Sequence, residues 1–156
     1  MVTGTVSVKV NNTTGGYFTS SRGVRQGDPL SPFLFNIAVD SLAKMISLAQ
    51  RNNLITGLVP NYIEHGVAIL QYADDTILCL QDNKEQATHL KLILYLYESM
   101  SGLKINFSKS EVIMISQNDS KSVEFSNMFN CAIGKWSLLP ALGFMWLIGC
   151  LLLKKL

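Results

Sequence analysis

Alternating hydrophobic and polar positions open the chain. Residues 6–10 follow a period of two, and a second strand-like run lies at residues 17–20. The intervening residues 11–16 are mostly asparagine and glycine, which adopt the positive backbone dihedral angles of tight turns. This pattern predicts a β-hairpin.

A helical pattern follows. Ser31 and Pro32 form a typical start signal, with the serine as N-cap and the proline in the first turn. Apolar residues then recur at helical spacing through residues 34–49, as on one face of an amphipathic helix. We expect one long helix here.

Two adjacent acids interrupt the next apolar segment. Residues 67–72 and 76–80 have the length and composition of strands, and Asp74 and Asp75 lie between them. The pattern predicts a second hairpin with both carboxylates at its tip.

The second half of the chain supplies one more helix and strand. Asn83 and Gln86 resemble a capping box, with Gln86 reaching back to the cap, and Gly102 is a typical helix stop. Residues 111–115 have the composition of a strand, whereas residues 118–127 are polar and weakly patterned. The order of elements predicts an α+β fold, in which helices pack on one face of an antiparallel sheet.

Composition adds limited constraints. The 156 residues are 48% hydrophobic and 15% charged, and the net charge of +2 neither requires nor excludes a nucleic-acid partner. Cys79, Cys131 and Cys150 lack metal-ligand spacing and are typical of buried thiols in a reducing compartment. His65 and His89 have no ligand partner nearby in the sequence.

The paired acids carry the strongest chemical signal. Neighbouring buried carboxylates repel each other, so a site that keeps both ionised needs a cation, and a divalent metal with oxygen ligands is the natural choice. The alternative is a polar hairpin turn, for which Asp-Asp is also common. Asp74 and Asp75 alone do not decide between these alternatives.

A glycine-rich, cationic loop precedes the first helix. Its glycines let the backbone approach a nucleotide closely, while Arg22, Arg25 and the helix N-terminus attract phosphate. The loop is therefore a candidate nucleotide-binding segment.

Three stretches together carry a family resemblance. They are Arg-Gln-Gly-Asp-Pro-Leu-Ser-Pro at residues 25–32, Tyr-Ala-Asp-Asp at residues 72–75 and Gly-Leu-Lys-Ile-Asn-Phe-Ser-Lys-Ser at residues 102–110. In this order, they resemble the reverse transcriptases of non-LTR, LINE-type retrotransposons. The resemblance implies part of a right-hand polymerase, mainly its palm, over residues 1–136.

The implied reaction is addition of deoxynucleoside triphosphates to a DNA primer on an RNA template. Two Mg²⁺ ions would assist it, with Asp74 as the firmer metal ligand and catalytic residue and Asp75 as the secondary one. Tyr72 would pack near the primer terminus.

The same resemblance assigns the remaining site residues. Gln26 and Gly27 would lie against the incoming nucleotide and template base, with Arg25 close by. Lys109 would lie near the triphosphate. Gln26 could instead be a satisfied loop amide and Lys109 a solvated turn residue, with Lys104 competing for its role.

The chain departs from the family pattern at two places. The family has a further essential aspartate on a strand expected before Met1, so we expect this chain to be inactive in isolation. Residues 137–156 replace the expected continuation with an apolar tail, which a reading-frame change would explain. The domain boundary is therefore expected after residue 136.

Alternative functions remain at this point. The fragment could be a non-catalytic RNA-binding or interaction module, although the sequence has no basic stripe or stacking platform. The uncharged residues 136–153 approach the length of a membrane-spanning helix, but proline and glycine interrupt them. The absence of a signal-peptide pattern indicates a nuclear or cytoplasmic location rather than a membrane protein.

Overall fold

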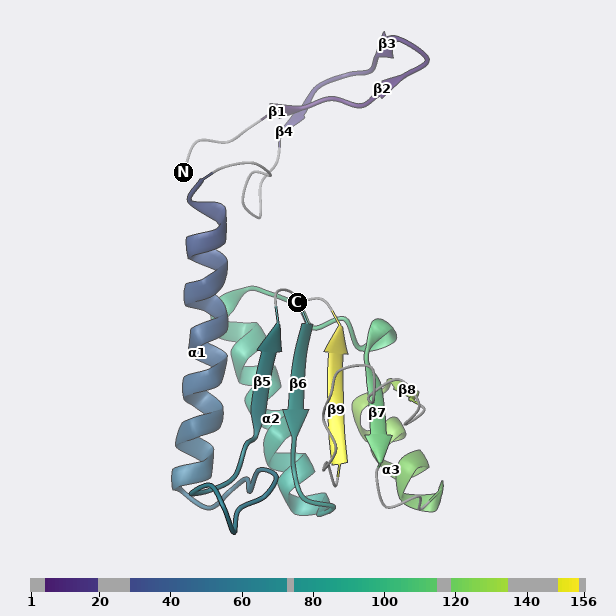
Figure 1. Ribbon diagram of the computed structural model, residues 1–156. Coiled ribbons are helices and arrows are strands. Elements are labelled where there is room, and N and C mark those ends of the chain that lie inside the picture. The colour runs from purple at the N-terminus through teal and green to yellow at the C-terminus, as the bar shows by residue number, and fades with distance from the viewer. Residues whose placement is uncertain (1–4, 20–28, 73–74, 115–118, 135–148, 155–156) are drawn as a thin grey trace. The chain divides into compact units, whose positions relative to one another are not determined.

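The computed structural model describes residues 5–19, 29–72, 75–114, 119–134 and 149–154 (Figure 1). The chain divides into two compact units, residues 1–39 and residues 40–156. The predicted site residues fall in both units.

The first unit contains the predicted β-hairpin, which is confirmed. Its tight turn is shorter than expected, because only Asn11 and Asn12 have positive φ, at 48° and 63°. Two antiparallel pairs build the hairpin: β1 (Thr5–Val6) with β4 (Phe18–Thr19), and β2 (Lys9–Val10) with β3 (Thr13–Thr14).

Helix α1 (Ser31–Arg51) confirms the long predicted helix. Ser31 is already helical rather than the N-cap, because the Leu34 N–H donates to the Leu30 carbonyl at 3.0 Å. Among the described residues, α1 alone has the length and hydropathy of a membrane-crossing helix, a test that core helices also pass. Within the second unit it buries Leu42, Ile46 and Ala49.

A five-stranded sheet forms the centre of the second unit. Helices α2 (Lys84–Ser101) and α3 (Asp119–Phe129) lie on one face of it (Figure 1). The α+β prediction is therefore confirmed, but the sheet is mixed, because its last pair is parallel. The strand order is β5 (Ile69–Tyr72), β6 (Asp75–Cys79), β9 (Gly149–Lys154), β7 (Glu111–Met114) and β8 (Ala132–Ile133).

Strand β9 lies inside the sheet rather than at its edge. It pairs antiparallel with β6 on one side and with β7 on the other. Strands β6 and β7 are therefore parallel, joined by α2, and separated by the width of one strand. Residues 149–154 thus belong to the sheet structurally and are not part of a membrane helix, while the origin of residues 137–156 stays a prediction.

Two apolar clusters cover the two faces of the sheet. The larger joins α1, α2 and α3 to the sheet residues Leu78 and Val112. The smaller, on the opposite face, consists of Leu58, Cys79 and Ile113 with partly buried neighbours. This division follows from the alternation of side chains along each strand.

The ends of α2 confirm its predicted bounds but correct one contact. The Asn83 side chain accepts hydrogen bonds from the Glu85 and Gln86 N–H groups at 2.8 and 3.3 Å. Gly102 ends the helix in the left-handed conformation, as expected. The Gln86 side chain does not reach back to the cap: its Oε1 accepts the Thr56 N–H at 2.9 Å and so ties the helix to the preceding loop.

Helix α3 lies where the sequence showed only a weak pattern. It buries Ser122, Phe125 and Phe129, three residues at helical spacing on a narrow face. The helical pattern of α2 would place both Tyr97 and Met100 in the core, but only Tyr97 is buried and Met100 is exposed.

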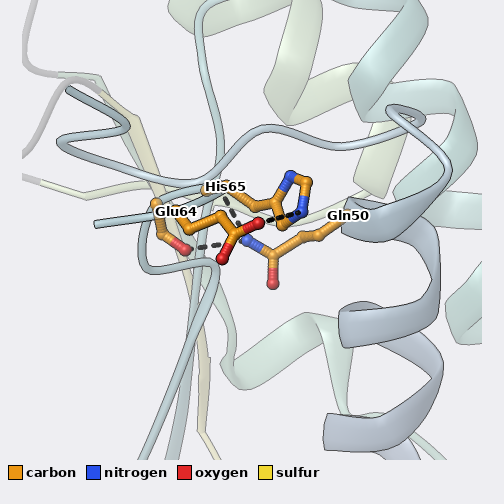
Figure 2. A network of polar contacts seen from close by, with 4 residues as sticks. Gln50, Glu64 and His65 are labelled. Atoms are coloured by element: carbon orange, nitrogen blue, oxygen red, sulfur yellow. Dashed lines mark hydrogen bonds and ion pairs between the residues drawn. The ribbon is translucent and has the colours of Figure 1, made fainter. Parts of the chain in front are cut away.

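Helix α1 is joined to the loop before β5 by a side-chain amide. Gln50 Nε2 donates to the carbonyls of His65 and Gly66 at 2.9 and 2.8 Å (Figure 2). In the same network, His65 Nε2 lies 3.8 Å from a carboxylate oxygen of Glu64. Because one amide satisfies two backbone carbonyls, it orients the loop that delivers β5.

Gly66 is required where this loop turns back on itself. Its φ is +71°, and a Cβ there would lie 2.5 Å from the Leu58 carbonyl oxygen. Gly102 has a similar φ of +72°, but a Cβ there would meet nothing within 4 Å. A substitution at Gly102 therefore tests the backbone strain of a positive φ alone, whereas a substitution at Gly66 adds a steric collision to that strain.

Gly66→Ala should lower the free energy of unfolding more than Gly102→Ala. The control substitution should cost about 1–2 kcal/mol for the left-handed backbone alone. Gly66→Ala adds the collision with Leu58 and should exceed it by at least about 1 kcal/mol. Urea denaturation measures both; equal losses would contradict the close approach.

Candidate active site

The second hairpin brings one of the two candidate carboxylates into a strand. Tyr72 of β5 pairs with Asp75, the first residue of β6, and residues 73 and 74 lie between them in the sequence. Asp75 is half-buried. The predicted hairpin is confirmed, with Asp75 in the strand rather than in the turn, whereas the placement of Asp74 lies outside the described residues.

The hydrogen-bond pattern of β6 determines toward which neighbouring strand the backbone groups of Asp75 are directed. The Cys79 N–H donates to the Ala68 carbonyl at 2.8 Å, so the backbone groups of Cys79 are directed toward β5. Backbone direction alternates along a strand, so those of Asp75 are directed toward β5 as well. On its β9 side, Asp75 therefore occupies a non-hydrogen-bonded position, where paired residues approach most closely.

A lysine occupies the register position opposite Asp75. Strand β9 pairs Lys154 with Asp75, and Leu152 with Ile77 two residues along. Cβ atoms of directly opposite residues lie about 4.5–5.5 Å apart in antiparallel sheets. The backbone thus sets a cationic residue type beside a carboxylate that is a candidate metal ligand.

Lys109 comes to the same end of the sheet. It is exposed in the short 3-10 helix η1 (Phe107–Lys109), which contacts β9 and immediately precedes β7. The end of β5, the start of β6, the end of β9 and η1 all lie at this end (Figure 1). Two sequence motifs that are far apart in the chain, those of Asp75 and Lys109, therefore lie at the same end of the sheet.

The other predicted nucleotide-binding residues are not described by the structure. Arg25, Gln26 and Gly27 lie outside the described residues, in the segment between β4 and α1. Their assigned roles stay predictions.

The described part of the chain includes only one of the two predicted metal ligands, Asp75. Within this part, no group of three or more histidine, cysteine, aspartate or glutamate side chains is close enough to hold a metal ion. His89 Nδ1 instead lies 3.0 Å from the Leu54 carbonyl oxygen. Magnesium needs several oxygen ligands in a set geometry, and the register sets a lysine rather than a further carboxylate opposite Asp75.

Sequence reasoning missed Lys154 because it treated the apolar tail as separate from the fold. A signal was available: Gly-Cys-Leu-Leu-Leu-Lys at residues 149–154 is an uncharged run of strand length that ends at a charge. Such a run suits a strand buried on both sides.

Comparison with protein families gives one matching model. Residues 1–129 match the family described as reverse transcriptase (RNA-dependent DNA polymerase). The matched region includes the glycine-rich loop, the β5–β6 hairpin and η1, and ends at the last residue of α3.

Several curated proteins are similar to the chain. A Xenopus laevis protein named Transposon TX1 uncharacterized 149 kDa protein is 33% identical over 69% of the chain. A Popillia japonica retrovirus-related Pol polyprotein from the type-1 retrotransposable element R2 is 37% identical over 61%. An uncharacterized mitochondrial protein of Arabidopsis thaliana is 37% identical over 43%.

The alignments cover only part of each relative. They span 8% of the Xenopus laevis protein, 12% of the Popillia japonica polyprotein and 55% of the Arabidopsis thaliana protein. No solved structure matches the chain.

Lys154→Asp should create a site for divalent cations. It sets two carboxylates opposite each other, which destabilises the sheet without metal and favours a shared cation. We expect the variant to bind Mn²⁺ on the order of tenfold more tightly than the unmodified chain. Calorimetric titration measures the affinity, and thermal unfolding with and without Mn²⁺ measures the linked stability.

Two further variants make this result specific. Lys155→Asp makes the same charge change one residue further along and should leave the affinity near that of the unmodified chain. Asp75→Asn combined with Lys154→Asp should abolish the gain. Equal gains in Lys154→Asp and Lys155→Asp would contradict the register.

Proposed function

Because the chain belongs to the reverse transcriptase (RNA-dependent DNA polymerase) family, we propose that it is part of a domain that copies RNA into DNA. Members of this family are nucleotidyltransferases, and the similar Pol polyproteins come from non-LTR retrotransposons. The chain is a partial domain of this kind. Its substrates are an RNA template, a DNA primer and deoxynucleoside triphosphates.

The observation that carries the proposal is the convergence of two sequence boxes at one end of the sheet. Asp75 begins β6 there, and Lys109 lies in η1 beside the neighbouring strands. A carboxylate and an exposed cation at the same end of the sheet suit the binding of a triphosphate together with its metal ion. In this proposal the sheet and its two helices are the polymerase palm.

The remaining roles follow the family motifs. Asp74 and Asp75 are the proposed metal ligands, and Tyr72 packs near the primer terminus. Arg25, Gln26 and Gly27, which the loop before α1 supplies, contact the incoming nucleotide and the template. When bound, two Mg²⁺ ions would supply charge stabilisation for transfer onto the primer 3′ end.

The chain is proposed to be inactive in isolation. The described carboxylates do not form a metal-binding group, and a lysine holds the register position opposite Asp75. Asp74 and Asp75 need at least one more oxygen ligand from protein to hold the ions with substrate. A strand that carries a carboxylate in place of β9 would supply it.

A second candidate function is RNA binding without catalysis. The lysine opposite Asp75 favours it, because a binding module has no need of a metal site. In that case RNA affinity falls with salt and is unchanged by joint substitution of Asp74 and Asp75 with alanine. Fluorescence anisotropy with a labelled RNA separates this function from a polymerase that has lost one ligand.

Primer extension tests the proposed polymerase function. The unmodified chain should not extend a DNA primer on an RNA template with Mg²⁺. A chimera should extend it when the segment preceding the matched region of the Popillia japonica polyprotein is fused before Met1 and residues 137–156 are removed. The reason is that an upstream strand replaces β9 and its lysine.

Matched substitutions identify the site. Asp75→Asn in the chimera should reduce extension by at least about a hundredfold if the carboxylate holds the metal. Glu64→Gln, an exposed carboxylate elsewhere, should leave it unchanged. Extension by the unmodified chain would overturn the proposed inactivity, and a chimera that binds primer–template without extending it would count against the polymerase function.

A further inference from the structure

Two cysteines are direct register partners across β6 and β9. The pairing aligns Cys79 with Cys150, and the same register runs without interruption to Asp75 and Lys154. Cys131, the third cysteine, lies before β8, on the far side of β7. The sheet therefore brings together two thiol-bearing positions that are 71 apart in the sequence (150 − 79).

The register makes Cys79 and Cys150 an antiparallel pair of the type with the shorter Cα separation. The Cys79 N–H donates to the carbonyl of Ala68, the residue before β5, so the backbone groups of Cys79 are directed toward the β5 side of β6. The Gly134 N–H donates to the Val112 carbonyl, which directs Ile113 toward β9 by alternation and makes Ile113 and Cys150 the hydrogen-bonded pair. Cys79 and Cys150 are then a non-hydrogen-bonded pair.

This geometry satisfies the distance requirement for a disulfide. Cα atoms of a non-hydrogen-bonded antiparallel pair lie about 4.5 Å apart. Disulfides span Cα separations of about 4.4–6.8 Å. No movement of either strand is needed to bring the two residues into range.

We propose that Cys79 and Cys150 form a cross-strand disulfide when the protein meets a low-molecular-weight disulfide such as oxidised glutathione. One cysteine thiolate attacks a glutathione sulfur and releases one glutathione thiol, leaving a mixed disulfide. The second cysteine thiolate attacks the protein-bound sulfur, forms the Cys79–Cys150 bond and releases the second glutathione. The two protons lost by the cysteines are taken up by the two glutathione thiols.

The bond fixes β9 between β6 and β7. Cys79 is fully buried, so exchange proceeds through local opening of the C-terminal strand. Once formed, the disulfide covalently retains the strand and, through the shared register, holds Lys154 opposite Asp75. Oxidation thus locks the register that sets Lys154 opposite Asp75, independently of whether the chain is a polymerase.

The folded 156-residue chain is treated with oxidised glutathione, denatured, and labelled with a maleimide. Trypsin separates the three cysteines onto peptides 52–84, 122–135 and 136–154. We expect labelled thiols to fall from three to one, with a link between the first and last peptides and the label on Cys131. Burial raises the pKa of the Cys131 thiol, which also slows its exchange.

Controls distinguish native pairing from chance pairing. Cys131→Ser should retain the link, Cys150→Ser should lose it, and chain oxidised in urea should give links that include the 122–135 peptide. Peptide mapping of the oxidised, unmodified chain tests the Cys79–Cys150 link even if a variant fails to fold. Three labelled thiols after oxidation, a link through Cys131, or a link found only in covalent dimers would overturn the proposal.

Discussion

The second compact unit depends on the filling of the gap between β6 and β7 by β9. The two outer strands run parallel and are joined by α2, so each presents a row of backbone groups to the space between them. Thr76 and Leu78 of β6 are fully buried and direct these groups toward β9. A buried backbone group without a partner costs about 1–3 kcal/mol, so an empty gap would destabilise the sheet severely.

The same strand determines the chemistry at the end of the sheet. Any strand in this gap has one residue opposite Asp75. The charge of that residue decides whether this end of the sheet attracts or repels a cation. Here the residue is Lys154. The family motifs assign the chain to a polymerase family. The lysine opposite Asp75 is one reason why the chain is proposed to be inactive in isolation.

Sequence reasoning succeeded where local rules decide the structure. The turn at Asn11 and Asn12, the cap at Asn83 and the stop at Gly102 each depend on the backbone preference of one residue. Sequence-based prediction failed where contacts between residues far apart in the sequence determine the structure. Gln86 bonds to Thr56 rather than to its own helix end, α3 is held by a narrow buried face, and β9 is recruited by two strands far away in sequence. Of the candidate site, Tyr72 and Asp75 occupy the predicted hairpin and Lys109 reaches its end of the sheet.

Interstrand nuclear Overhauser effects test the position of β9 most directly. A non-hydrogen-bonded antiparallel pair brings its two α-protons close together, so cross-peaks are expected between the α-protons of Asp75 and Lys154, of Ile77 and Leu152, and of Cys79 and Cys150. Absence of these cross-peaks, together with direct cross-peaks between β6 and β7, would contradict the central position of β9 and the charge arrangement that follows from it.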